Sequence, residues 1–139
     1  MSDPFVGFNQ SPKPNPNAKR VRMESLVAFE VDLPYLLGRI TSQAGFESVF
    51  GQTKKFDFRQ GAKLEFLAES ESYRGTISQI NLPKRLILNT EKHGEIELVF
   101  ASKNDKANVN LSVRANLEPQ DQDSWEQEAE LLKQRLGGI

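Results

Sequence analysis

Apolar and polar residues alternate over much of this chain, a pattern typical of antiparallel strands that have one face in water. The alternation is clearest at 108–117, where Val109, Leu111 and Val113 fall on one side and polar residues on the other. Such segments predict strands at 24–31, 55–58, 64–66, 76–80, 85–88, 95–101 and 108–117. Pro83 lies in a turn between two of them, because proline lacks a ladder donor. We therefore expect a sheet of about six to seven strands.

Helical spacing predicts two short helices after the first strand and one long helix at the end of the chain. Pro34 suits the first turn of the first helix, Gly45 is expected to separate it from the second, and Gly51 to end the second. N-cap candidates at 121–124 and a stop at Gly137 bound the last helix. Its apolar stripe consists of Trp125, Ala129, Leu132 and Leu136. This order predicts an α+β fold with the helices packed on one face of the sheet.

Composition limits the partners and the compartment. Residues 1–22 contain four prolines and bury too little apolar area to become ordered, so we expect a disordered or extended tail before a single domain at 23–139. Eighteen basic and nineteen acidic residues create no field that would attract nucleic acid. We see neither a secretory signal nor an apolar stretch of roughly 20 residues that could span a membrane, and we expect a cytoplasmic protein.

Candidate chemistry is sparse. The chain has no cysteine, which excludes thiolate metal sites and cysteine nucleophiles, and its one histidine has no second histidine to share a metal or a triad. That residue, His93, lies in a Lys-His-Gly turn and is expected to be exposed. Asp57 and Glu65 alternate with phenylalanines and should face water rather than act as an acid–base pair. We expect no metal, no cofactor and no catalytic residue, with an enzyme such as a cyclase or dehydratase the least favoured class.

A family resemblance follows from the turn region and the last helix. The segments 75–77 and 80–86, the strand EIELVF at 95–100 and the helix at 125–136 resemble homologues of the activator of the ninety-kilodalton heat-shock ATPase (AHSA type). The resemblance covers about residues 24 to 136 and implies the START-like (SRPBCC) helix-grip fold, in which a curved antiparallel sheet wraps a long C-terminal helix. Phe46 and Phe50 stand where the family often has a tryptophan-containing pair.

The resemblance leaves two functions open. Members of the wider superfamily bind lipids, polyketides or other apolar ligands between sheet and helix, which implies a cavity here, although a solid core is the alternative. The residues expected to line that cavity are Phe29, Tyr35, Phe56, Phe66, Tyr73, Ile77, Leu88, Leu98, Val113, Trp125 and Leu132. Tyr35, Tyr73 or Arg114 would orient a small apolar or amphipathic ligand at the rim. The second function is a co-chaperone-type interaction module that binds a chaperone through the acidic helix face at Glu126 and Glu130.

Overall fold

A six-stranded antiparallel sheet forms the centre of the computed structural model, which describes residues 18–69 and 71–139. The strands are β1 (Lys19–Ala28), β2 (Lys63–Phe66), β3 (Tyr73–Asn81), β4 (Arg85–Thr90), β5 (Gly94–Lys103) and β6 (Lys106–Leu117). The helices are α1 (Leu33–Thr41), α2 (Gln43–Phe50) and α3 (Gln122–Gly137), and a 3₁₀ turn at Pro119–Asp121 precedes α3. Strands β2 to β6 pair in chain order, and β1 returns to pair with β6.

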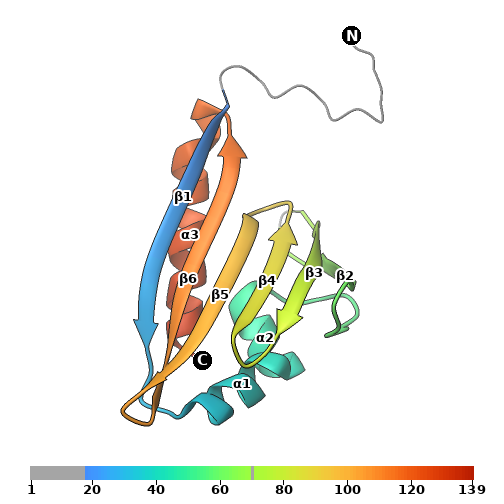
Figure 1. Ribbon diagram of the computed structural model, residues 1–139. Helices are drawn as coiled ribbons and strands as arrows, with labels where there is room; N and C mark the ends of the chain where they lie inside the picture. Colours follow the sequence, from blue (N-terminus) through green and yellow to red (C-terminus); the bar gives the residue numbers. More distant parts are fainter. Residues whose placement is uncertain (1–17, 70) are drawn as a thin grey trace.

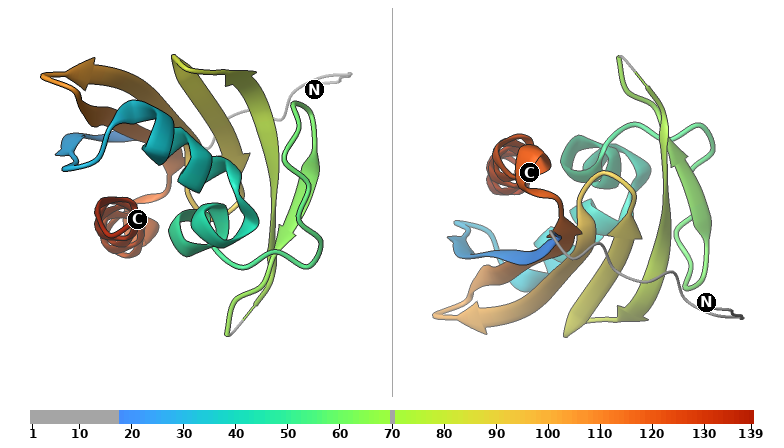
Figure 2. Two further views of the ribbon diagram at one scale, coloured as in Figure 1. Left: turned by 90° about the horizontal axis from the view of Figure 1, so that it is seen from below. Right: turned by 90° about the horizontal axis from the view of Figure 1, so that it is seen from above.

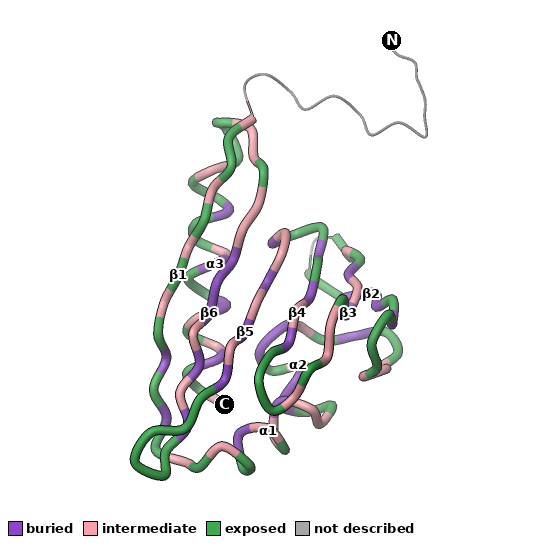
Figure 3. The backbone as a smooth tube through the Cα atoms, viewed as in Figure 1, coloured by how far each residue is buried: buried purple, intermediate pink, exposed green. Residues whose placement is uncertain are grey.

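The sheet bends around the helices, and all three helices lie on its concave face (Figures 1 and 2). The predicted α+β helix-grip arrangement is therefore confirmed. Buried positions alternate with less buried ones along β4 and β5 (Figure 3), because successive side chains point to opposite faces of a sheet. The predicted stripe of α3 is buried against the same core as the inward residues of β6. Burial of these facing apolar surfaces is what holds α3 on the sheet.

The beginning of the sheet differs from the prediction. Strand β1 starts at Lys19 and ends at Ala28, so residues 19–22 belong to the sheet and not to the expected tail. The basic residues Lys19, Arg20 and Arg22 made this segment look like part of the tail. They are exposed in β1, and Val21 between them is partly buried. Residues 1–17 of the predicted tail lie outside the described residues.

Two further predictions were wrong, one about a helix boundary and one about a strand. The helices α1 and α2 meet at Ser42, whose side-chain oxygen accepts a hydrogen bond from Gly45 N (3.1 Å), so Gly45 lies inside α2. A side chain at Gly45 would collide with the Arg39 carbonyl at the end of α1, which explains the glycine. The segment 55–58 is not a strand: the rings of Phe56 and Phe58 both contact Phe46, at centroid distances of 5.5 and 5.9 Å.

Candidate functional site

Most residues predicted to line a cavity are buried in the core. Between 0 and 8% of the surface of Phe29, Phe66, Ile77, Leu88, Leu98, Val113, Trp125 and Leu132 is exposed. The ring of Phe66 lies over Gly75, where an added Cβ would come within 2.8 Å of Phe66 Cε2. Phe56 is half-buried against α2, and Arg114 lies on the outer face of the sheet, bonded to Glu97 (2.6 Å). Apart from Phe29, which also borders the recess described below, the eight buried side chains lie inside the core.

His93 is buried beneath α3 and not exposed, contrary to the sequence prediction. Only 1% of its surface is exposed, because the β4–β5 turn folds under Trp125, whose Nε1 donates to the His93 carbonyl (2.9 Å). The hydroxyl of Thr90 lies 3.1 Å from His93 Nδ1 and accepts a hydrogen bond from His93 N (2.9 Å). The other ring nitrogen, Nε2, is buried and has no hydrogen-bond partner among the described residues.

The surroundings of His93 keep its ring neutral and enclosed. Burial, followed by the nearby charges of Lys92 and Arg135, lowers the pKa of His93 to about 4, while Glu128 acts in the opposite direction. Lys92 Nζ pairs with Glu128 Oε1 (3.4 Å) between the turn and α3. The predicted site residue Tyr73 contacts the His93 ring edge-on, at a centroid distance of 6.1 Å. At neutral pH the His93 ring therefore carries no charge.

An open recess lies at the other end of α3. It has a volume of about 300 Å³ and is bounded by the residues after β1, by α1 and by the C-terminal end of α3. Its lining residues are Ala28, Phe29, Glu30, Val31, Tyr35, Leu36, Arg39, Gly137, Gly138 and Ile139. Two of these, Phe29 and Tyr35, are predicted site residues, and Tyr35 stands at the rim with 57% of its surface exposed.

The sequence builds this recess from a helix cap and a pair of glycines. The carboxylate of Asp32 accepts a hydrogen bond from Tyr35 N (2.9 Å), which starts α1 and fixes the rim. At the opposite wall α3 ends in Gly137 and Gly138, which add no side chains to the lining. A Cβ added at Gly137 would reach only one neighbour, at 3.8 Å, so the space above it is free.

Arg39 supplies the charge of the recess. In the part of the chain that the structure describes, its guanidinium forms no hydrogen bond and no ion pair. The one acidic residue of the lining, Glu30, is bonded to Lys106 Nζ (2.6 Å), and this hydrogen bond lowers the pKa of Glu30. The recess thus combines apolar walls with a cation that no residue of 18–69 or 71–139 neutralises. Sequence reasoning missed Arg39, which follows Leu36 by three residues and so lies on the same side of α1.

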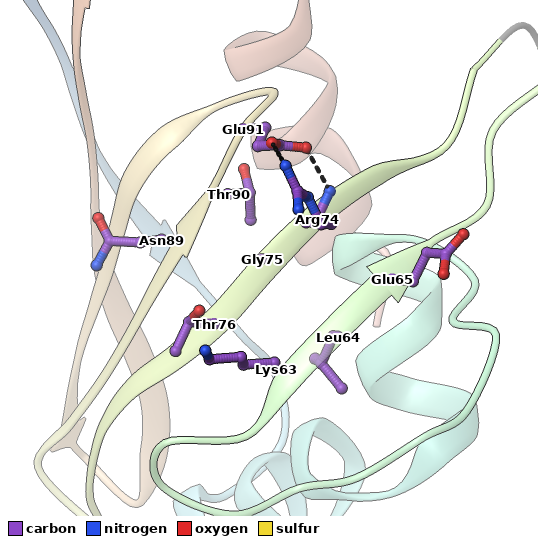
Figure 4. Close-up of a pocket in the computed structure, with 9 residues that line it drawn as sticks. All are labelled: Lys63, Leu64, Glu65, Arg74, Gly75, Thr76, Asn89, Thr90 and Glu91. Carbon is purple, nitrogen blue, oxygen red and sulfur yellow. Dashed lines mark hydrogen bonds and ion pairs between the residues drawn. The ribbon is translucent and has the colours of Figure 1, made fainter.

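A second depression crosses the outer face of β2, β3 and β4 (Figure 4). It has a volume of about 560 Å³, and Gly75 lies between its two rows of side chains. One row holds Lys63, Thr76 and Asn89, and the other holds Glu65, Arg74 and Glu91. Arg74 and Glu91 neutralise each other at 3.0 Å. Most of its lining side chains are polar or charged, and the groove is more open to solvent than the recess, so it encloses a ligand less.

Metal and membrane chemistry find no support in residues 18–69 and 71–139. These residues contain no group of three or more His, Asp or Glu side chains that could hold a metal ion. None of the helices they form is long and apolar enough to cross a bilayer.

Solved structures with the same architecture identify the fold. A protein of Bacillus halodurans superposes with a TM-score of 0.69 at 9% identity, covering 84% of this chain and 98% of its own. The AHSA1-like protein of Aeromonas hydrophila gives 0.59 at 16% identity, covering 85% and 93%. The chain has the fold of AHSA1-like proteins. The Aha1 dimer of Colwellia psychrerythraea gives 0.62 at 10% identity, covering 81% and 90%. The sequence itself matches no protein-family model and no curated protein.

Proposed function

We propose that this AHSA1-like fold serves as a non-enzymatic binding domain for a small amphipathic carboxylate, held in the recess between β1, α1 and the end of α3. The observation that carries the proposal is the guanidinium of Arg39, which has no partner among the described residues, beside the apolar walls of Phe29 and Leu36. The sequence analysis predicted a site between the sheet and the C-terminal helix. The proposed site lies at the end of that helix.

The physical properties of the recess favour this ligand class. A volume of about 300 Å³ lies at the lower end of ligand pockets and suits a short chain or a single ring system. Removal of an apolar tail from water against the partly buried Val31 and Ile139 contributes most of the binding free energy. A carboxylate on Arg39 forms charge-assisted hydrogen bonds, which are roughly twice as strong as neutral ones. Tyr35, at the rim, is placed to contact the ligand as it enters.

Titration with two matched probes tests the proposal. Octanoate and 1-octanol share a chain length and differ in charge, and each is added to the full chain while backbone amide shifts are recorded by two-dimensional NMR. We expect perturbations from both probes at residues 28–31, 35–39 and 137–139. Arg39→Gln should weaken octanoate binding by about tenfold or more, because a hydrogen bond to a charged group is worth about 1.5–3 kcal/mol, and leave octanol unchanged.

A second arginine provides the control. Arg74→Gln removes a guanidinium from the outer-face groove and should leave octanoate binding at the recess intact. Shifts confined to residues 63–76 and 89–91, or no shifts with either probe, would exclude the recess as the binding site.

A protein-binding role is the second candidate, and the solvent side of α3 favours it. Glu126 and Glu130 flank Leu131 there, which is 42% exposed, in a shallow depression of the helix surface. An acidic surface with an exposed leucine suits a partner that presents a basic, partly apolar patch. The test is the ATPase turnover of a ninety-kilodalton heat-shock chaperone with and without the protein. An increase that Glu126→Lys abolishes supports this role, and an unchanged rate removes it.

A further inference from the structure

The two edges of the sheet are protected to different degrees. At the β2 edge the chain covers itself: Lys54 N donates to Glu65 O (2.9 Å) and Leu67 N donates to Gln52 O (2.8 Å). At the opposite edge lies β1, the outermost strand in Figure 1, which pairs only with β6 among the described residues. It is also one of the longer strands, with ten residues. A long unpaired edge offers a ready template for another strand.

The backbone of β1 points a regular row of donors and acceptors away from the sheet. Phe29 N donates to Ala107 O (3.0 Å), and this bond sets the phase of the ladder, because bonded and non-bonded pairs alternate between antiparallel strands. In the register of β1 with β6, the alternate residues Arg22, Glu24 and Leu26 therefore direct their N–H and C=O groups outward. No other described segment bonds to these groups.

The side chains of β1 leave apolar and charged groups exposed along the same edge. Leu26 has 66% of its surface exposed, and Val21 and Met23 are only partly buried against the core. Arg22 and Glu24 lie on the outer face, joined by an exposed ion pair of 3.1 Å. Neighbouring charges of opposite sign distinguish this edge from one blocked by a row of like charges.

The charge order of β1 is complementary to itself. If two copies pair antiparallel about a two-fold axis through Met23, Arg22 lies opposite Glu24 of the second copy, and the reverse contact follows by symmetry. Because Arg22 and Glu24 both point their backbone groups outward, these positions form hydrogen-bonded pairs in the new ladder. In the same register Arg20 faces Leu26 of the second copy, where its aliphatic stem can cover that exposed side chain.

We propose that β1 is an interface for a second copy of this chain, paired antiparallel about Met23 so that the two sheets become one continuous sheet. Backbone hydrogen bonds and the covering of Val21, Met23 and Leu26 hold the two copies together. The Arg22–Glu24 pairs select the register more than they add affinity, since exposed ion pairs contribute little. Shifting one copy by two residues would place Glu24 opposite Glu24 of the other, which is repulsive.

Charge exchange tests the interface and its register together. Sedimentation velocity of the full chain over a hundredfold concentration range should show a monomer–dimer equilibrium. Arg22→Glu and Glu24→Arg each place like charges opposite one another at both symmetric contacts, and each should raise the dimer dissociation constant by about tenfold. An equimolar mixture of the two variants restores both contacts and should again form dimers, as should the double exchange Arg22→Glu/Glu24→Arg.

Three results would overturn the proposal. A chain that stays monomeric at all concentrations has no such interface, and a dimer that neither single exchange weakens uses another surface. Failure of the mixture to restore dimers would refute the register about Met23. Thermal unfolding of each variant accompanies the measurement, since Glu24 also accepts a hydrogen bond from Asn110 Nδ2 (2.9 Å) within the same copy. Lys63→Glu on the outer face of β2 serves as the charge-change control and should leave the dimer unchanged.

Discussion

The two ends of α3 meet the rest of the protein in opposite ways. Near its beginning Trp125 is buried, and its indole donates to the carbonyl of His93, so the helix seals a polar cluster. At its end Gly137 and Gly138 carry no side chains, and the apolar floor around Phe29 stays open as a recess. One helix thus closes the core at one end and leaves an open recess at the other.

The comparison indicates why the side chains near the two ends of α3 differ in exposure. A tryptophan with a bonded N–H fills a large volume and satisfies a buried carbonyl at once, whereas a helix that stops at glycine exposes whatever lies beneath it. The sealed end should therefore control stability, and the open end should control binding. The following experiments compare the contributions of the two ends of α3 to stability.

The largest effect is expected at the sealed end. Trp125→Ala removes the buried ring and leaves the His93 carbonyl without its donor, and the free energy of unfolding should fall by about 3–5 kcal/mol. Urea unfolding followed by far-UV circular dichroism measures the loss. Leu131→Ala, on the solvent side of the same helix, is the matched control and should cost less than about 1 kcal/mol. Equal losses in both variants would contradict the division.

The second-largest effect on the free energy of unfolding is expected when acid protonates His93 at the sealed end. Because burial lowers the pKa of His93 from 6.5 to about 4, the neutral ring is favoured in the folded state. Its contribution to stability is complete above pH 6.5, is lost as the pH falls toward 4, and does not change further below that. The loss amounts to about 3 kcal/mol, since one pKa unit corresponds to about 1.4 kcal/mol.

Unfolding free energies measured from pH 7.5 to 3.5 test this dependence. The variant His93→Gln cannot titrate, so the difference between its stability and that of the unchanged chain should shrink across the window from 6.5 to 4. Carboxylates such as Glu47 titrate in both proteins and cancel in this difference. A difference that is constant with pH would mean that His93 is accessible to protons in the folded state.

A smaller effect is expected from Tyr73, which joins the sealed cluster to α2. Its hydroxyl donates to the carbonyl of Phe50 at the end of that helix (3.2 Å), and its ring stacks on Phe66. Tyr73→Phe keeps the stacking and removes the hydrogen bond, which should cost about 1 kcal/mol in urea unfolding. Tyr73→Leu, which loses the stacking as well, should cost more. If the two variants were equal, the hydroxyl would be the group that matters.

The sequence predicts well where one periodic pattern decides the structure. The stripe of Trp125 and Leu132 and the alternation of Val109 to Val113 were both confirmed, because each follows from a single element with one buried face. The segment at Phe56 also alternates, yet it forms no strand, because β2 pairs instead with the chain at Thr53. Alternation indicates which side chains are buried, but it does not show which segments pair through backbone hydrogen bonds.

The site depends on contacts that no local pattern contains. The burial of His93 follows from the position of Trp125 on a helix that begins about thirty residues later, and the Lys-His-Gly turn gave no sign of it. One local signal was present: Thr90 precedes His93 by three residues and caps the turn. The recess likewise requires the start of α1 to face the end of α3, which only the folded chain brings together.

The smallest change in stability is expected at the open end. Tyr35→Ala removes a ring that stands mostly in water at the rim of the recess, so the free energy of unfolding should change by no more than about 0.5 kcal/mol. The backbone N–H of residue 35, which Asp32 caps, is kept in this variant, and α1 should therefore remain intact. Urea unfolding of the variant beside Trp125→Ala measures the two ends of α3 in one experiment. A loss of several kcal/mol at Tyr35 would show that the rim is part of the core, and the recess would then be a packing defect and not a binding surface.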